Sequence, residues 1–195
     1  MKSCPEEKLE KFVKQSLAVN AAGAHTYDHI MRVYLLAKMI GTGIGADMRV
    51  LGAAALLHDV GRPRETETGV SHSILSGEMS REVLIAAGYT QDEVKQIDDA
   101  IRTHRFSEGL TPTSKEGEVL SDADKLDAIG AIGVFRAVSQ AAAEDRGMEG
   151  FLRHADEKLL KLHRLMYTKS GKALAKRRNA FLQEFVNRLR EESRY

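Results

Sequence analysis

Apolar residues recur along nearly the whole chain at spacings of three and four residues, the pattern of helices that bury one face. The same spacing predicts helices over residues 9–19, 26–41, 48–60, 71–87, 90–104, 118–143, 151–167 and 172–190. No sustained alternation of apolar and polar residues predicts a strand. The pattern therefore predicts an all-α fold, a single compact multi-helix domain over residues 1–195.

Residues that cap or break helices mark several boundaries of these elements. Asp47 is an expected N-cap, and Thr90 begins the Thr-x-x-Glu pattern of a capping box. Gly41 and Gly61 are predicted to end the second and third helices, because glycine commonly follows the last helical residue. These signals predict short connections between helices.

The composition is that of an ordinary globular protein, with 43% apolar and 29% charged residues. The net charge of +1 gives no sign of a nucleic-acid or membrane partner, and it leaves the oligomeric state open. No apolar run approaches the ~20 residues of a membrane span, and the charged N-terminus has no signal core, so we expect a cytoplasmic protein. Cys4 is alone, which excludes a cysteine-rich zinc site within one chain.

The stretch LLHDVGRPRE places a histidine and an aspartate side by side at the end of an apolar helix. His58 follows Ala54 by four residues and Leu51 by seven, so it points toward the core. Asp59 is turned from it by about 100°. A buried carboxylate is costly unless it is paired or bound to a metal. Alone, the pair is also compatible with an ordinary buried histidine and a helix-end aspartate.

Other imidazole and carboxylate groups fall on helix faces that are expected to be buried. His29 lies on the apolar face of the helix over residues 26–41. The segment LSDADKLDAIGAIG carries three aspartates among apolar and small residues, and periodicity leaves both Asp122 and Asp124 as inward-facing candidates. One of these carboxylates is expected to bind a cation. Imidazole with carboxylate suits Mn, Fe, Co, Ni or Zn better than Ca.

Taken in order, these residues resemble the H…HD…D signature of the HD superfamily of metal-dependent phosphohydrolases. The segments DHIMRVYLLA, AAALLHDVGR and SDADKLDAIGAIGVFRA are similar to those around the family's ligands, and the match covers residues 24–137. The segment TKSGKALAKRRNAFLQEF resembles a subfamily of stand-alone HD proteins. The resemblance implies an HD-domain fold, with C-terminal helices over residues 151–190 packed on the signature region.

The resemblance also implies one or two divalent metal ions, of Mn, Fe, Co, Ni, Zn or Mg. The implied ligands of the first ion are His29, His58, Asp59 and Asp124. Asp124 is assigned because it occupies the family's Ala-Asp-x-x-Asp position. The nearby groups Asp122 and Asp127 are expected to orient these ligands. His25 is a candidate for the same role, and a helix-capping or surface role for it stays open.

Further residues match positions that vary within the superfamily. His72 and His104 correspond in order to the extra histidines of two-metal members, which implies a second ion or a place in the phosphate pocket. Arg62 occupies a position where relatives carry Lys or Arg near phosphate, and Arg102 and Arg105 are weaker candidates of the same kind. The alternatives are ordinary histidines at helix ends and exposed cations.

The implied activity is hydrolysis of a phosphate ester, in a nucleotide or another small phosphorylated metabolite, by metal-activated water. The expected catalytic residues are Asp59, Arg62, His72 and His104. Two alternatives remain open, an HD-fold di-iron oxygenase and a non-catalytic module that senses a nucleotide. The Gly-Tyr-Pro motif of cyclic-di-GMP phosphodiesterases is absent, and Thr103 stands where they carry a second adjacent histidine, which argues against that substrate.

Overall fold

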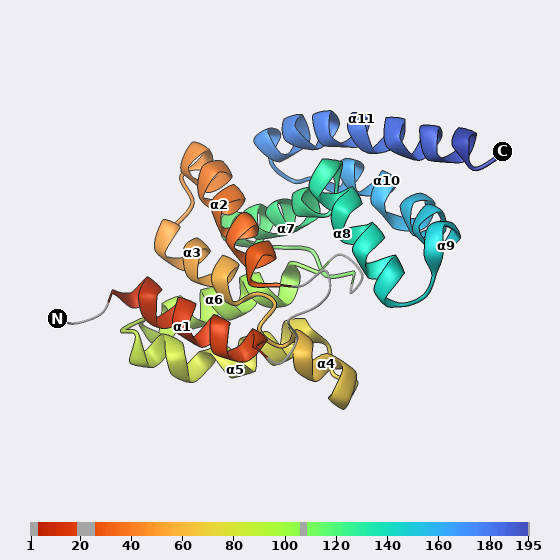
Figure 1. Ribbon diagram of the computed structural model, residues 1–195. Helices are drawn as coiled ribbons and strands as arrows, with labels where there is room; N and C mark the ends of the chain where they lie inside the picture. Colours follow the sequence, from red (N-terminus) through yellow and green to blue (C-terminus); the bar gives the residue numbers. More distant parts are fainter. Residues whose placement is uncertain (1–3, 19–25, 106–108, 195) are drawn as a thin grey trace. The chain divides into compact units, whose positions relative to one another are not determined.

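Every regular element in the described part of the chain is a helix, as the computed structural model shows (Figure 1). The structure describes residues 4–18, 26–105 and 109–194, without the side chain of Thr66. The all-α prediction is confirmed. The chain divides into a first unit over Met1–Ala123 and a second unit over Asp124–Tyr195. The expectation of a single domain over residues 1–195 stays a prediction.

The first unit is built around one apolar helix. Its helices are α1 (Pro5–Leu17), α2 (Tyr27–Ile44), α3 (Met48–Leu57), α4 (Arg62–Thr68), α5 (His72–Ala86) and α6 (Gln91–Thr103), and α7 (Lys115–Asp127) begins in it. Helix α3 packs against α1, α2, α5 and α6, and every residue from Val50 to Leu57 is buried. Because neighbours cover all sides of α3 from Val50 onward, its residues there are apolar or small all round.

The chain changes direction sharply after α3. The helix ends at Leu57, three residues before the end that the pattern predicted, and turns follow. Gly61 lies so close to α5 that a Cβ there would come within 2.7 Å of the Ser76 backbone nitrogen. The chain then enters α4, which the sequence analysis did not predict, with Pro63 in its first turn. This close approach brings His72, at the start of α5, toward the end of α3.

Two predicted helix starts are confirmed, and the predicted end of the second helix at Gly41 is wrong. Asp47 caps α3 by accepting hydrogen bonds from two backbone N–H groups of its first turn. Thr90 and Glu93 form the predicted capping box of α6. Helix α2 continues through Gly41 and stops at Gly45, whose φ of 67° is a left-handed conformation that favours glycine. The end of α2 therefore depends on the backbone conformation at Gly45.

The prediction of one helix over residues 118–143 is wrong. Helix α7 ends at Asp127, and α8 (Gly130–Ala143) begins only after Ile129, which is extended with φ −128° and ψ 166°. Gly130 has a φ of 77°, again in the left-handed region. Small apolar residues continue the helical spacing across this break, so the hydrophobic pattern does not reveal it.

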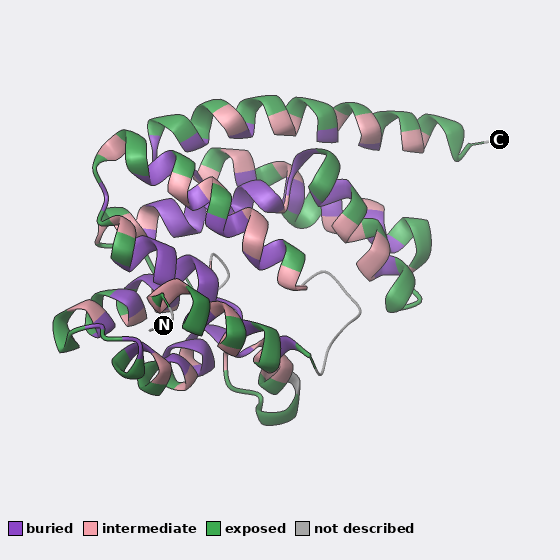
Figure 2. Ribbon diagram, turned by 60° about the vertical axis from the view of Figure 1, so that its left-hand side comes forward, coloured by how far each residue is buried: buried purple, intermediate pink, exposed green. Residues whose placement is uncertain are grey.

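The second unit continues with α9 (Gly147–His154), α10 (Leu160–Leu162) and α11 (Lys169–Glu192). The helix predicted over residues 151–167 is divided, because a π-helical turn precedes α10 and a 3₁₀ turn follows it. Helix α11 contains the whole of the helix predicted over residues 172–190. Figure 2 shows α11 with a buried stripe along one side and exposed residues along the other, as an amphipathic helix requires.

In the described part of the chain, no single helix combines the length and the apolar composition needed to cross a membrane. Helices α7 and α8 meet those two criteria only when they are taken together as a bent pair. Helix α3 is apolar but has 10 residues, about half of the ~20 that a span needs. The cytoplasmic location stays a prediction.

Candidate metal centre

The candidate site is centred on the carboxylate of Asp59, which lies just after α3 and is 1% exposed. Its Oδ2 atom is 3.6 Å from Nε2 of His29 and 3.8 Å from Nε2 of His58. Its Oδ1 atom is 3.2 Å from Nε2 of His72 and 3.9 Å from Nε2 of His104. The two oxygens of one carboxylate therefore face two different pairs of histidines.

These histidines come from separate elements of the first unit. His29 lies in the first turn of α2, His58 follows α3, His72 is the first residue of α5 and His104 follows α6. All four are buried although their spacing in the sequence is wide. The structure thus brings the four histidines together around Asp59.

Backbone hydrogen bonds orient two of the imidazole rings. Nδ1 of His58 lies 2.8 Å from the carbonyl oxygen of Ala55, and Nδ1 of His104 lies 2.5 Å from that of Ile101. A carbonyl oxygen only accepts, so Nδ1 carries the proton in each ring and Nε2 keeps its lone pair. Both Nε2 lone pairs are then turned toward Asp59, the arrangement in which histidine binds metals.

The His72 ring shows most clearly that a cation fits between these groups. Its Nε2 atom is buried and has no hydrogen-bond partner among the described residues, although Oδ1 of Asp59 is 3.2 Å away. Its Nδ1 atom is bonded to the carboxylate of Glu65 at 3.1 Å. If Nδ1 donates to Glu65, the Nε2 lone pair and the Asp59 carboxylate face each other without a proton between them. Two acceptors in this position are costly unless a cation lies between them.

The separations also suit two ions. The His29, His58 and Asp59 ligand atoms lie within 4.8 Å of one another, and so do those of Asp59, His72 and His104. Two ligands that each hold one ion at about 2.1 Å lie about 3 to 4 Å apart, similar to the separations observed here. The donor set of imidazole and carboxylate groups therefore fits one or two divalent transition-metal ions.

The charge of His72 is set by burial and by Glu65. Burial lowers the pKa of His72 and outweighs the opposing effect of the Asp59 charge, so the ring is neutral at pH 7. Partial burial raises the pKa of Glu65, but its hydrogen bonds with His72 and the charge of Arg62 outweigh this effect and hold the pKa at about 2. A neutral imidazole is the form that binds metals.

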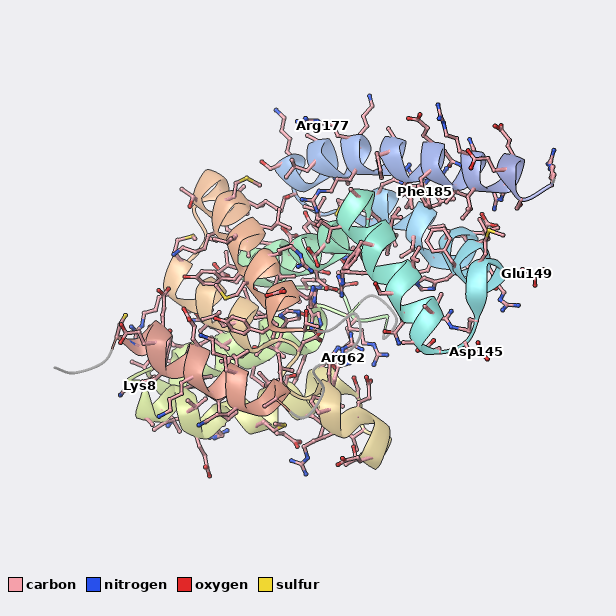
Figure 3. All side chains as sticks on the ribbon, in the orientation of Figure 1. Lys8, Arg62, Asp145, Glu149, Arg177 and Phe185 are labelled. Atoms are coloured by element: carbon pink, nitrogen blue, oxygen red, sulfur yellow. The ribbon has the colours of Figure 1, made fainter. Side chains whose placement is uncertain are left out.

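Two arginines lie beside this centre. Arg62, at the start of α4 (Figure 3), donates through Nε to Oδ1 of Asp59 at 3.0 Å and through a terminal nitrogen to Glu65 at 3.3 Å. Arg105 donates to the other oxygen of Glu65 at 2.6 Å. Both side chains remain about a quarter to a third exposed, at 24% and 30%. Arg102, by contrast, pairs with Asp98 at 2.8 Å.

The three aspartates of α7 have different surroundings. Asp127 is buried against Arg136, whose guanidinium donates to it at 2.9 Å, so an ion pair accounts for its burial. Asp122 is fully buried. Asp124 is partly buried and is the first residue of the second unit, and its role as a fourth ligand stays a prediction. His25 lies outside the described residues.

Glu65 is the polar residue of this centre that the sequence analysis missed. It lies on α4, where the pattern predicted only a break at Gly61 and Pro63. A signal was present, because proline is favoured in the first turn of a helix and acidic residues follow it there. The contact between Glu65 and His72, however, depends on the packing of α4 against α5.

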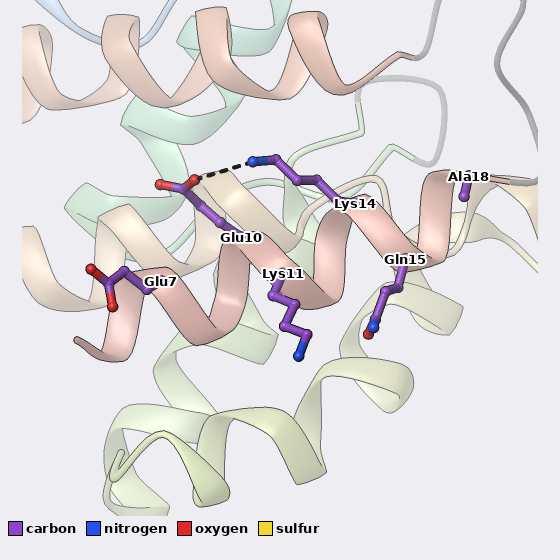
Figure 4. Close-up of a pocket in the computed structure, with 6 residues that line it drawn as sticks. All are labelled: Glu7, Glu10, Lys11, Lys14, Gln15 and Ala18. Atoms are coloured by element: carbon purple, nitrogen blue, oxygen red, sulfur yellow. Dashed lines mark ion pairs between the residues drawn. The ribbon is translucent and has the colours of Figure 1, made fainter. Parts of the chain in front are cut away.

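A shallow depression on α1 lies outside this cluster (Figure 4). Its lining residues are Glu7, Glu10, Lys11, Lys14, Gln15 and Ala18. Lys14 and Glu10 form an ion pair of 3.9 Å across one helical turn. Exposed pairs of this kind contribute little to stability, and none of the lining residues is a histidine. The depression is an ordinary charged helix surface.

Comparisons with known proteins agree with this fold. The sequence model of the HD domain matches residues 26–129. The uncharacterized protein YpgQ of Bacillus subtilis is 31% identical over 189 residues, covering 91% of this chain and 89% of YpgQ. The structure of YpgQ in complex with ADP has a TM-score of 0.78 and 28% identity, covering 96% of this chain and 97% of that one. The structure of an HD-superfamily hydrolase from Bacillus thuringiensis has a TM-score of 0.77 and 31% identity, covering 97% of this chain and 96% of that one.

Proposed function

Because this chain belongs to the HD domain family, we propose that it is a metal-dependent phosphohydrolase. Its proposed substrate is a phosphate ester, in a nucleotide or another small phosphorylated metabolite. The observation that carries the proposal is the Asp59 carboxylate, whose two oxygens face two pairs of buried histidines. The chain has the fold of HD-superfamily hydrolases, which supports this reading.

Two ions are proposed, with Asp59 shared between them. The ligands of the first are His29, His58, Asp59 and Asp124, and those of the second are Asp59, His72 and His104. Mn, Fe, Co, Ni and Zn suit this donor set, and Mg is a further option. Such ions, when bound, lower the pKa of a bound water from about 16 to about 7, which supplies hydroxide at neutral pH.

The side chains of this protein supply the rest of the proposed mechanism. Arg62 lies beside Asp59 and is partly exposed, so its guanidinium would donate to the phosphoryl oxygens and offset their charge. The buried histidines keep bulk water from the reacting groups.

Nucleotides are the first substrates to test. The structure of YpgQ contains ADP, and the similarity covers nearly all of both chains. A nucleotide also offers several phosphoryl oxygens, which suit a site with two arginines near the proposed ions. These observations support a nucleotide as the phosphorylated substrate.

Phosphate release by metal-reconstituted protein, measured on a panel of nucleotides and phosphate esters, tests this proposal. We expect release that a chelator abolishes and added metal restores. Oxygen consumption by the iron-loaded protein without phosphate release would contradict the proposal and favour an HD-fold oxygenase. Bound metal and tight nucleotide binding without turnover would also contradict it and favour a sensing module.

Arg62→Ala is expected to lower kcat/KM by about tenfold or more while metal binding is unchanged, because a charge-assisted contact with phosphate is lost. The measurement is steady-state phosphate release together with elemental analysis of the bound metal. Arg64→Ala is the matched control, since Arg64 is exposed on the same helix. Equal kcat/KM values for the Arg62 and Arg64 variants would contradict a role in phosphate binding and indicate that Arg62 is an ordinary surface cation.

Asp124→Ala is expected to weaken binding of the first ion, because the proposal assigns this carboxylate as its fourth ligand. Asp122→Ala is expected to keep the ion. Because Asp122 is fully buried, this substitution should change the free energy of unfolding more than Asp124→Ala does. Elemental analysis and circular dichroism of both variants separate loss of metal from loss of fold. Full metal in the Asp124 variant with loss in the Asp122 variant would reverse the assignment.

A further inference from the structure

The carboxylate of Glu65 accepts hydrogen bonds from three different residues, unlike a typical carboxylate on a helix surface. It lies on α4, and its side chain is 24% exposed. Its hydrogen-bond donors are the backbone N–H and Nδ1 of His72, a terminal nitrogen of Arg62 and a terminal nitrogen of Arg105. The carboxylate thus joins α4, the start of α5 and the residue just beyond His104.

The contact with His72 sets which ring nitrogen carries the proton. Nδ1 is 3.2 Å from Oε1 of Glu65 and 3.1 Å from Oε2, and a carboxylate only accepts. Nε2 of His72 therefore keeps its lone pair, directed at Asp59 in a buried position where it has no hydrogen-bond partner among the described residues. A carboxylate behind a ligating histidine fixes its ring orientation in metal sites.

The contacts with the two arginines hold like charges close together. Arg62 and Arg105 donate to opposite oxygens of Glu65, at 3.3 Å and 2.6 Å. Two guanidinium groups repel each other, and a carboxylate between them offsets that repulsion. Both guanidinium groups are partly exposed, at 24% and 30%, so the pair presents positive charge to solvent beside Asp59.

We propose that Glu65 is a positioning residue, which directs Nε2 of His72 to a second metal ion and holds Arg62 and Arg105 together for an anionic substrate. The inference rests on the proposed phosphohydrolase function and adds a residue to it. Glu65 acts through its neighbours and touches neither the reacting phosphorus nor the ions.

Glu65→Gln tests the inference with little change in shape. The amide keeps one acceptor oxygen, but its NH₂ group cannot accept from an arginine or from Nδ1 of His72. Titration of metal-free protein with Mn²⁺, followed by calorimetry and electron paramagnetic resonance, measures both binding steps. We expect the first ion to bind as in wild type and the second to bind about 10- to 100-fold more weakly. Glu67→Gln, exposed on the same helix, is the matched control.

The spectrum separates positioning from general stability. Two Mn²⁺ ions that share a carboxylate give an exchange-coupled signal, which the variant should reach only at higher Mn²⁺ concentration than wild type. The KM for a hydrolysed nucleotide should also rise, because the arginine pair is no longer held together. A merely structural Glu65 would lower the melting temperature and leave the ratio of the two affinities unchanged.

The outcomes distinguish this inference from the proposed function. If wild type binds two ions and Glu65→Gln binds both equally well, the inference is overturned and the proposed function stands. If wild type binds a single ion, the second-ion role is overturned, and metal-dependent hydrolysis still supports the function. If wild type takes up no metal after reconstitution, both are overturned.

Discussion

Asp59→Ala is expected to leave the protein folded but without bound metal. Asp59 is the residue that both proposed ions share, and its oxygens lie within 3.9 Å of all four histidine Nε2 atoms. Loss of a group that merely orients a ligand costs about 10- to 100-fold, so loss of the shared ligand should lower hydrolysis by more than about 100-fold. Elemental analysis after reconstitution with Mn²⁺ or Co²⁺ measures the effect.

The fold should survive this change for two reasons. Asp59 lies in the turn after α3 and forms no part of a helix ladder. Its ion-pair partner Arg62 is 24% exposed, so water can solvate the guanidinium when the carboxylate is gone. Circular dichroism should therefore match that of wild type. Asp28→Ala, an exposed carboxylate beside His29, is the control and should keep its metal. Full metal occupancy in the Asp59 variant would contradict the proposed centre.

The double variant His72→Ala/His104→Ala is expected to bind one ion where wild type binds two. These histidines face Oδ1 of Asp59, whereas His29 and His58 face Oδ2, so removing the first pair leaves the other half of the site intact. Phosphate release should fall by about 100-fold or more, because His72 and His104 would no longer hold the second ion, which would supply charge stabilisation to the reacting phosphoryl group.

His163→Ala provides a control with similar local chemistry. Nδ1 of His163 is hydrogen-bonded at 2.9 Å to the carbonyl oxygen three residues earlier, and Nδ1 of His104 has the same kind of partner at 2.5 Å. His163, however, lies in the second unit. This variant should bind both ions. The two-ion proposal is wrong if wild type and the double variant bind a single ion each and hydrolyse substrate equally fast.

Much of the fold follows from local sequence rules. Helical spacing identified α2, α3, α5 and α6, and side-chain chemistry located the N-caps at Asp47 and Thr90. These features depend on residues within a few positions of each other, so a linear pattern contains them. The break at Gly130 escaped the same rules, because a left-handed glycine among small apolar residues leaves the periodicity unchanged.

Part of the candidate site also follows from local sequence rules, and part of it does not. The burial of His29, His58 and Asp59 follows from the helix faces on which they lie, since helical spacing orients each side chain. His72 and His104 lie at helix ends, where helical periodicity does not predict the direction of a side chain. Only their order along the chain suggested a role. Their burial beside Asp59 is a finding of the structure.

The sequence by itself determined the helical class, the family signature and the inward direction of the first histidines, because these depend on local spacing and residue order. Only the tertiary structure decided which histidine faces which oxygen of Asp59. It also revealed Glu65, whose partners His72 and Arg105 lie on other segments of the chain. The physical reason is that these contacts arise from the packing of α4 and α5 around the end of α3, where Gly61 permits a close approach that no linear spacing encodes.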